Sequence, residues 1–535
     1  MPAYPVLFLY SHNNGWLAVN ELFLPLALVM LAAGALLFLL KLLARDWDLA
    51  AALTAFWGLW FFSYGHVLSI GQYLPAASAQ FLERHAIWAW LAIALLGTFL
   101  LFRVRRRLLK LRSPLNLFAL ALVLFSVLNI VHYEYLRLRA PGRRPDRAAS
   151  TTTSAQATEL KTFPDIYYII LDGYARPDVF EELYGDSNER FVNYLESRGF
   201  VIAKHSRANY ALTELSLASS LNMRYLEDIA AGLGASASDM APVQEMVKHS
   251  AVAAFLRDKG YTIATMSQNG KSHIEADIAL PLDKGLQAAV SVSPFPDFRT
   301  VLLDMTPLRA LLHISKLQAI TVDEPDKEIY AGVRRLRLSF FKNLENFPKS
   351  SSPRFIYAHL IAPHPPFLFK RDGTPNPQSR TVNFSDAVIG LGGINETRES
   401  YLRNYREQLL FISTKLQYSL EKLLAESGRP KVIILQSDHG PGAYFDWYDG
   451  HNSYARERMS ILNAYYFSDG PPRELYDSIT PVNTFRMVFD HYFNANLPLL
   501  KDKCALSISA KPYYLIDVTD KTGRLPKDKL PKLPK

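Results

Sequence analysis

The stretch KVIILQSDHGPGAYF, residues 431–445, decides the fold class of the chain. It opens with apolar, β-branched residues, a pattern typical of a strand buried on both faces of a mainly parallel sheet. The strand ends in Asp438 and His439. Ligands of such sheets bind beyond the carboxyl ends of the strands, so a carboxylate and an imidazole at this place indicate a functional site.

Similar apolar strands alternate with helical segments through the second part of the chain. The predicted strands are DIYYIIL, FVIAKHS, YTIATM and RFIYAHL, at 165–171, 200–206, 261–266 and 354–360. The predicted helices are FEELYGDSNERFVNYLESRG, AVAAFLRDKG, TKLQYSLEKLLAESG and the packing helix TPVNTFRMVFDHYF, at 180–199, 251–260, 414–428 and 480–493. The alternation predicts an α/β domain whose mainly parallel sheet is covered by helices on both faces.

The first part of the chain is predicted to cross a membrane about four times. Its apolar runs lie near Leu22–Leu40, Leu49–Ile70, Ile87–Phe102 and Leu115–Val131. A span needs about 20 mostly apolar residues. Buried helices of a soluble core are the alternative, but such runs in succession favour the membrane. We therefore expect a transmembrane domain over 1–138, a linker rich in Pro, Ser, Thr and Ala over 139–162, and a catalytic domain over 163–535.

Lysine and arginine in the short loops predict the orientation of these spans. The segment FRVRRRLLKLRSP, residues 102–114, is strongly basic and is expected to be a cytoplasmic loop, whereas the loop at 71–86 carries only Arg84. The catalytic domain is then outside the cytoplasm, on the periplasmic face of a bacterial inner membrane. Arginines at 137–147 disagree with this orientation, but long domains translocate largely regardless of flanking charge. A fifth span that includes PVLFLY, residues 5–10, stays open.

Charge and cysteine content exclude some classes of protein. The formal net charge is +9, but many of the arginines lie beside the apolar runs and no nucleic-acid-binding motif is present, so no nucleic-acid partner is expected. Cys504 is the single cysteine. It can form neither an internal disulfide nor a cysteine-built metal site.

Polar residues follow three of the predicted strands. Asp172-Gly173 follows the first, His359 ends the RFIYAHL strand, and Asp438-His439 follows the 431–436 strand. Singly, an Asp-Gly is a turn and a loop histidine is a surface residue. Because the three strand ends face one crevice, their carboxylates and imidazoles, with an oxygen of Thr213, predict a site for a divalent metal such as Zn²⁺ or Mn²⁺.

The order of these motifs resembles the alkaline phosphatase superfamily, in particular its sulfatase-like membrane branch. That branch includes lipoteichoic acid synthases and phosphoethanolamine transferases. The shared order is strand–Asp-Gly, T-x-x-S at 213–216 opening a helix, H-x-x-x-P-H at 359–364, and strand–S-D-H-G at 437–440. The S-D-H-G motif is the most specific of them. The resemblance extends from about residue 164 to the C-terminus and implies the fold predicted above.

The resemblance implies a role for each matching residue. Asp172, Asp438 and His439 would be metal ligands, and Thr213 would be both a ligand and the nucleophile. His364 and His451 would assist catalysis by protonating the leaving group. The remaining candidates would bind substrate: His359, Asn209, Arg176 and Ser216, of which Ser216 is also an alternative nucleophile.

Departures from the family narrow the chemistry that the resemblance implies. Sulfatases need C/S-x-P-x-R, whose first residue becomes formylglycine, and no such motif surrounds Thr213. Two-metal relatives carry an additional D-x-x-x-H, which is not found before the S-D-H-G motif. We therefore expect one divalent metal ion, Zn²⁺ or Mn²⁺ before Mg²⁺ or Ca²⁺.

Together, the spans and the resemblance predict a membrane-anchored, metal-dependent phosphotransferase. It would move phosphoethanolamine or phosphoglycerol from a phospholipid donor to a glycan or lipid-linked acceptor of the cell envelope, through a phospho-threonine. A membrane-bound phosphodiesterase or phosphatase that uses water as acceptor needs the same first half-reaction and stays an alternative. A non-catalytic membrane scaffold is a third hypothesis, which the retention of Thr213, Asp438 and His439 disfavours.

Overall fold

The computed structural model describes most of the 535 residues. The described residues are 1–13, 19–69, 76–139, 163–266, 274–280, 298, 302–303, 305–308, 325–348, 350–376, 386, 397–526 and 529–530. The chain divides into two compact units, one formed by 1–151 with 292–325 and the other by 152–291 with 326–535. The predicted linker lies, from residue 140 to 162, outside the described residues.

The first unit consists of mainly apolar helices of very different lengths. They are α1 (Tyr4–Asn13), α2 (Asn20–Ala44), α3 (Trp47–Phe61), α4 (Tyr64–Ser69) and α5 (Ala76–Arg139). Among the described residues, three stretches are long and apolar enough to cross a membrane: Glu21–Ala44, His85–Val104 and Arg112–Tyr135. They match the first, third and fourth predicted spans.

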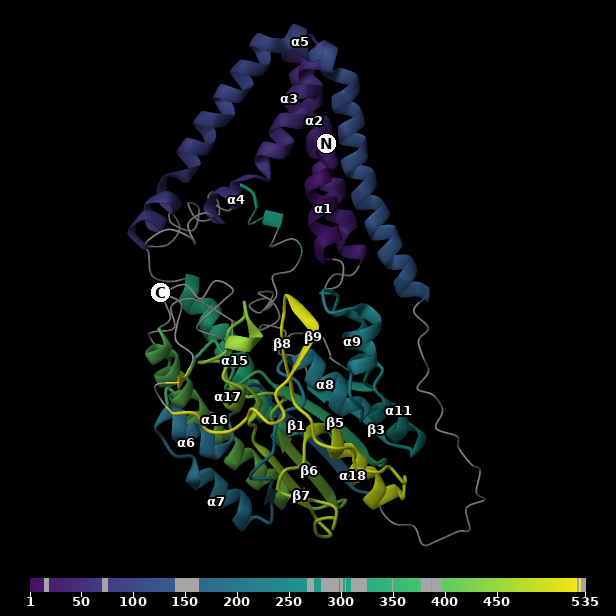
Figure 1. Cartoon of the computed structure of the whole chain (residues 1–535), viewed down its shortest axis with the longest axis vertical. Helices are drawn as coiled ribbons and strands as arrows, with labels where there is room; N and C mark the ends of the chain where they lie inside the picture. Colours follow the sequence, from purple (N-terminus) through teal and green to yellow (C-terminus); the bar gives the residue numbers. More distant parts are fainter. Residues whose placement is uncertain are drawn as a thin grey trace. The chain divides into compact units, whose positions relative to one another are not determined.

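Two details of this unit differ from the sequence prediction. The second predicted span is divided between α3, which has 15 residues, and the short α4, so neither helix alone reaches the roughly 20 residues of a span. The prediction of a loop at 102–114 is wrong, because α5 continues as a helix through these residues and past Pro114. Leucine, arginine and lysine are good helix formers, which explains the continuity. Figure 1 shows α5 as two arms that meet at a bend.

The second unit is built around a seven-stranded sheet with the order β2-β7-β6-β1-β5-β3-β4. Its strands are β1 (Asp165–Leu171), β2 (Val201–Ile202), β3 (Thr262–Met266), β4 (Ile278–Leu280), β5 (Arg354–Leu360), β6 (Lys431–Gln436) and β7 (Asn463–Phe467). The central β1 is parallel to β5 and β6, and the β3 pairs are parallel too, whereas β7 is antiparallel to β6 and to β2. The mainly parallel sheet is therefore confirmed. A separate hairpin consists of β8 (Ala505–Ile508) and β9 (Lys511–Asp517).

Helices cover both faces of this sheet (Figure 1). They are α6 (Pro177–Tyr184), α7 (Glu189–Ser197), α8 (Thr213–Asn222), α9 (Glu227–Leu233), α10 (Ala241–Lys248), α11 (Ala251–Asp258), α15 (Pro325–Glu345), α16 (Arg398–Ala425), α17 (Ala455–Met459) and α18 (Pro481–Phe493), with a 3₁₀ turn η2 (Gly450–Asn452). Alternate residues of β1 enter two different cores: Tyr167 and Ile169 pack with residues of α6, α7, α15 and α16, while Tyr168 and Ile170 pack with residues of α8, α10, α11 and α18. Burial on both faces explains why β1 reads as a continuous apolar run.

Four strands (β1, β3, β5 and β6) and the packing helix follow the sequence prediction closely, and two other predicted elements do not. The predicted strand FVIAKHS is reduced to the two residues of β2 at the edge of the sheet. The predicted helix over 180–199 is two helices, because Gly185, with φ of 67°, ends α6 in the left-handed conformation that favours glycine.

Candidate active site

The carboxyl ends of β1, β5 and β6 lie side by side in the centre of the sheet. Ile170 of β1 is opposite His359 of β5 and Gln436 of β6. The residues that follow these positions therefore emerge at the same edge, as the sequence predicts. Asp172 directly follows β1 and is only 5% exposed.

Ser437 fastens the turn after β6 to the end of β1. Its hydroxyl lies 2.6 Å from the carbonyl oxygens of Leu171 and His439, and it accepts a hydrogen bond of 2.8 Å from the backbone N–H of Tyr174. The two strand ends that carry the candidate ligands are thus joined through one side chain. This serine is buried with 0% exposure, so its role is to shape the turn.

Hydrogen bonds orient the side chains of Asp438 and His439. Asp438 Oδ1 accepts from the backbone N–H groups of Gly173 (3.2 Å) and His439 (3.0 Å). His439 Nδ1 lies 2.8 Å from the Gly440 carbonyl, and because a carbonyl can only accept, Nδ1 carries the hydrogen. His439 Nε2 is then left with its lone pair, as a metal-binding imidazole requires.

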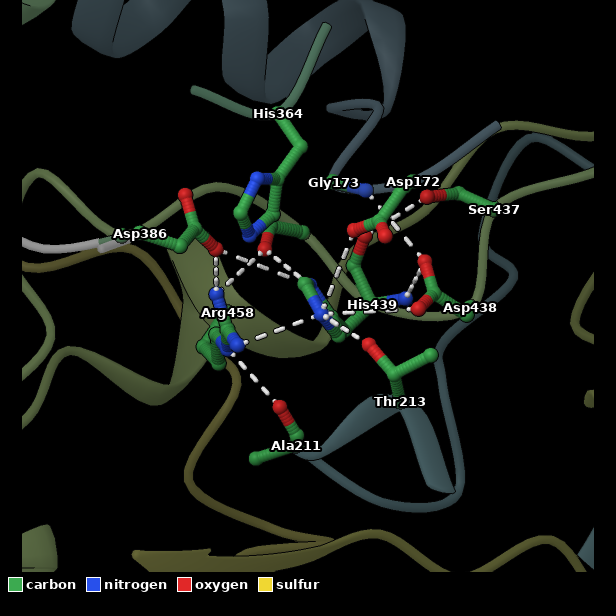
Figure 2. Close-up of polar contacts among 12 residues, drawn as sticks. Asp172, Gly173, Ala211, Thr213, His364, Asp386, Ser437, Asp438, His439 and Arg458 are labelled. Carbon is green, nitrogen blue, oxygen red and sulfur yellow. Dashed lines mark hydrogen bonds and ion pairs between the residues drawn. The ribbon is translucent and has the colours of Figure 1, made fainter. Parts of the chain in front are cut away.

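Thr213 brings its hydroxyl to the same place. It is the first residue of α8, and Leu212 is the N-cap, so the hydroxyl is not used as the helix cap. Instead, Thr213 Oγ1 lies 3.1 Å from His439 Nε2 (Figure 2). A helix N-terminus beside a nucleophile also offers backbone N–H groups and a positive dipole to an anionic phosphoryl group.

Ser216 lies one turn further along α8. It is 2% exposed, and its hydroxyl donates a 2.7 Å hydrogen bond to the backbone carbonyl of Asp438. In this arrangement Ser216 holds the loop that carries Asp438, while the hydroxyl near the imidazole is that of Thr213.

The buried carboxylates suit a cation. Within the described part of the chain, Asp172 Oδ1 and Asp438 Oδ2 are buried oxygens that receive no hydrogen bond. Asp172, Asp438 and His359 each offer a ligand atom, and these atoms lie within 4.8 Å of one another. His439 Nε2 is 3.6 Å from Asp172 Oδ1 and 3.5 Å from Asp438 Oδ2. Carboxylate oxygens that accept no hydrogen bond, together with imidazole nitrogens, form a set of ligand atoms that fits a divalent ion such as Zn²⁺.

His359 is predicted to bind substrate, and it lies deeper than that role suggests. It is 5% exposed, and its Nε2 is 3.3 Å from Asp172 Oδ2, the oxygen on the opposite side of the carboxylate from His439. Sequence reasoning grouped His359 with the phosphoryl-binding residues. The structure brings it to the carboxylates.

His364 reaches the site through the loop after β5. Its backbone N–H donates to the carbonyl of Asp172 at 3.0 Å, and its ring centroid is 6.5 Å from that of His439. The turn that follows Asp172 contains Gly173, whose φ of 70° lies in the left-handed region that favours glycine. Burial alone would raise the pKa of Asp172, but His364, followed by His359 and His439, outweighs burial and holds that pKa below its usual range.

Three other candidates make contacts outside this cluster. Arg176 donates to Asp178 and to the carbonyl of Ser206. The Asn209 side chain donates to the carbonyl of Lys503 and accepts from the backbone N–H of Val482.

The third of these candidates, His451, is exposed on η2. Its Nε2 lies 3.5 Å from Tyr514 Oη, and its backbone N–H donates to Asp449. The described contacts do not bring Arg176, Asn209 or His451 to Thr213, so their roles stay predictions.

Sequence reasoning missed two charged residues of the site, Asp386 and Arg458. Both are buried, they form an ion pair, and Arg458 Nη2 lies 3.3 Å from His439 Nε2 (Figure 2). Arg458 stands among other charged residues in YARERMS and Asp386 belongs to no recognised motif. Neither position gives a local signal in one sequence.

Comparisons with known proteins identify the family of the chain and several distant structural likenesses. The Sulfatase family model matches residues 164–487. Among solved structures, similar ones include the C-terminal periplasmic domain of EcEptC from Escherichia coli in complex with Zn (12% identity, 69% of this chain and 95% of that chain, TM-score 0.41). The integral membrane protein lipooligosaccharide phosphoethanolamine transferase A from Neisseria meningitidis is another (13% identity, 75% and 69%, TM-score 0.37).

Phosphonate monoester hydrolase of Agrobacterium radiobacter is also similar (15% identity, 64% of this chain and 75% of that chain, TM-score 0.36). These structural likenesses are distant. A search of curated proteins finds no match. The family model covers more than half of the chain, so the protein belongs to the Sulfatase family of enzymes, within the predicted alkaline phosphatase superfamily.

Proposed function

We propose that this protein is a membrane-anchored, metal-dependent phosphotransferase. It transfers phosphoethanolamine or phosphoglycerol from a phospholipid to a glycan or lipid of the cell envelope, through a phosphorylated Thr213. The observation that carries the proposal is the position of Thr213 Oγ1, 3.1 Å from His439 Nε2 and beside two buried carboxylates. A hydroxyl in that position has no need to cap its helix and is free to react.

Asp172, Asp438, His439 and Thr213 would hold one divalent cation, with His359 orienting Asp172 from its other side. When bound, such a cation supplies Lewis-acid stabilisation of an alkoxide and of charge on a phosphoryl oxygen. Zn²⁺ or Mn²⁺ suits the mixture of carboxylate and imidazole ligands better than Mg²⁺ or Ca²⁺ does.

In the first half-reaction, Thr213 Oγ1 attacks the phosphorus of the phospholipid head group. The bond between phosphorus and the diacylglycerol oxygen breaks as the Thr213 O–P bond forms. The Thr213 proton passes to solvent, and His364, on the loop that contacts Asp172, would deliver a proton to the departing oxygen. In the second half-reaction, an acceptor hydroxyl attacks the phosphorus, the Thr213 O–P bond breaks as the acceptor O–P bond forms, and the acceptor proton is released while Thr213 Oγ1 takes up a proton.

The apolar helices of the first unit support a lipid donor. Three of its described stretches are long and apolar enough to cross a membrane, which is more than a simple tether needs. Together with the basic residues at 103–112, which lie where the second of these stretches ends and the third begins, they support a catalytic unit on the outer side of the membrane. A reporter that is active only in the periplasm, fused after Lys535, tests this orientation.

The full-length protein in detergent, loaded with Zn²⁺ or Mn²⁺ and given labelled phosphatidylethanolamine or phosphatidylglycerol, tests the reaction. We expect release of diacylglycerol and a Thr213 peptide whose mass is increased by the head group. Thr213→Ala should abolish both signals. Ser216→Ala is the matched control on the same helix turn, and its adduct at Thr213 should persist.

Two outcomes contradict the proposal. Undiminished release of diacylglycerol by Thr213→Ala would remove Thr213 as the nucleophile. Discharge of the Thr213 adduct to water at the same rate with and without glycan or lipid acceptors would favour the phosphodiesterase alternative.

A further inference from the structure

Arg458 is a buried guanidinium next to the proposed active site. Its exposure is 1%, and its charge is balanced by Asp386, which is 2% exposed. Asp386 also accepts a 2.7 Å hydrogen bond from Tyr401 Oη, and the guanidinium carbon lies 4.6 Å from the ring centroid of Phe445. The attraction within a buried ion pair barely offsets the cost of removing both ions from water, so stability alone does not explain it.

One side of Arg458 contacts the loop that leads to the nucleophile. Arg458 Nε donates a 3.0 Å hydrogen bond to the carbonyl of Ala211, which lies two residues before Thr213. The next residue, Met459, accepts a 2.7 Å hydrogen bond from the backbone N–H of Ala208. The end of α17 is therefore fastened to the chain that immediately precedes α8.

The other side of Arg458 contacts the metal-ligand loop. Arg458 Nη1 donates a 3.0 Å hydrogen bond to the Gly440 carbonyl, the same oxygen that accepts from His439 Nδ1. The Gly440 N–H donates back to the Arg458 carbonyl at 2.7 Å. This approach requires glycine, because a Cβ at residue 440 would lie 2.0 Å from the carbonyl oxygen of Glu457.

We propose that the Asp386–Arg458 pair is a positioning pair that sets the separation between the Thr213 hydroxyl and the His439 imidazole. Arg458 is almost fully buried, its Nη2 lies 3.3 Å from His439 Nε2 (Figure 2), and it joins the two loops and polarises the Gly440 carbonyl that fixes the His439 tautomer. The inference rests on the proposed function, because it takes Thr213 as the nucleophile and His439 as a ligand.

The chain provides a matched control in Asp165 and Arg354. This ion pair is similarly buried, with both side chains 6% exposed, but it lies at the amino ends of β1 and β5. A pair that only supports folding should behave like this control. A positioning pair should also change the affinity for metal and the turnover.

The test compares Asp386→Asn, Arg458→Lys and the double variant with Asp165→Asn, all in the full-length chain. Zn²⁺ affinity of the metal-stripped proteins is measured by titration calorimetry, and kcat and KM by diacylglycerol release. Substitution of residues that orient metal ligands typically lowers affinity or activity by about tenfold to a hundredfold, and we expect that loss for Asp386→Asn. The expected loss is in Zn²⁺ affinity and kcat, with KM little changed, and Asp165→Asn should retain the parent values of all three.

Tyr401→Phe provides a milder variant if the ion-pair variants do not fold. It removes the hydrogen bond to Asp386, together with the one that Tyr401 Oη accepts from the backbone N–H of Gly442 at 3.0 Å, and keeps both charges, so a smaller loss in the same direction is expected. The inference is overturned if Asp386→Asn, or Tyr401→Phe in its place, binds Zn²⁺ and turns over like the parent. The inference is also overturned if Asp165→Asn loses as much Zn²⁺ affinity as Asp386→Asn does. If instead the parent binds Zn²⁺ but never releases diacylglycerol, the proposed function fails, and the Zn²⁺ affinities still decide whether the pair positions His439.

Discussion

The two ends of the central strands carry buried carboxylates that differ in their hydrogen bonding. At the amino ends, both Asp165 oxygens accept hydrogen bonds from Arg354, whose backbone N–H (2.8 Å) and Nε (3.0 Å) donate to them. At the carboxyl ends, Asp172 and Asp438 are as deeply buried, yet one oxygen of each receives no hydrogen bond from the described residues. Burial and charge are therefore alike at the two ends. The ends differ in the number of carboxylate oxygens that accept hydrogen bonds, as expected if Asp172 and Asp438 hold a cation and Asp165 serves the fold alone.

The largest effect should follow from Asp172→Asn. The amide keeps the size of the side chain but removes the charge that would balance a cation. We expect Zn²⁺ binding to be lost and diacylglycerol release to fall by at least about a thousandfold, since removal of a reacting or ligating group has effects of this size. Calorimetry and product release measure the two losses. Retention of Zn²⁺ affinity by this variant would remove Asp172 from the ligand set.

Asp165→Asn, at the amino ends of the strands, should lower stability rather than activity. It leaves the buried Arg354 guanidinium without its counter-charge, a change that costs about 3 kcal/mol in unfolding free energy. Chemical unfolding of the full-length protein measures this cost. Specific activity of the remaining folded protein should equal that of the parent, and a selective loss of activity would show that the amino ends also serve the site.

Glu457 offers a third kind of buried carboxyl group. It is 0% exposed, and burial raises its pKa to about 8. Its oxygens lie 2.6 Å from Tyr184 Oη and 2.7 Å from the backbone N–H of Tyr444. The folded chain thus retains a proton that the unfolded chain releases near pH 4.5, so this contribution to stability is complete below that pH and is lost as the pH rises towards 8.

Glu457→Gln should remove this pH dependence. Between pH 5 and 8 the parent should lose roughly 1 kcal/mol of unfolding free energy per pH unit relative to the variant. Unfolding midpoints of both proteins across that range measure the difference, in which the contributions of unchanged groups cancel. Parallel curves for the two proteins would mean that Glu457 is already ionised when folded.

The smallest effect is expected for Gly173→Ala, in the turn that follows Asp172. At φ of 70° an alanine is strained by about 1 kcal/mol, and its Cβ would lie 3.8 Å from His364, which is ordinary contact. Unfolding free energy should fall by that amount while Zn²⁺ affinity stays within about twofold, which is less than 0.5 kcal/mol. A larger loss of affinity would show that the turn itself tunes the position of Asp172.

Much of the fold was predictable because the strands that form the centre of the sheet are locally distinctive. The structure assigns β5 and β6 the predicted bounds, since both are apolar runs buried on both faces. The edge strand β2 was overestimated because strand propensity does not reveal whether a partner is present along its whole length. The antiparallel β7 was missed.

The candidate site was predictable where a proposed ligand follows a strand directly. Asp172, Asp438 and His439 are of that kind, and the structure brings them together with Thr213. His359 was predicted to bind substrate. Its buried position beside Asp172 depends on the register between β1 and β5, which the sequence alone does not reveal. Asp386 and Arg458 form an ion pair although they are 72 residues apart in sequence, and no local sequence pattern indicates it. Only the tertiary structure reveals this pair.

The central place of β1 has a consequence for folding. Gly173 and Asp438 are 265 residues apart in sequence, and their hydrogen bond exists only after β6 has paired with β1. Contacts of such long sequence separation form slowly and late. The candidate cation site therefore forms only when the sheet is completely assembled, and a partly folded chain should not contain it. A metal ion that binds only this assembled state would pull the folding equilibrium towards it by mass action.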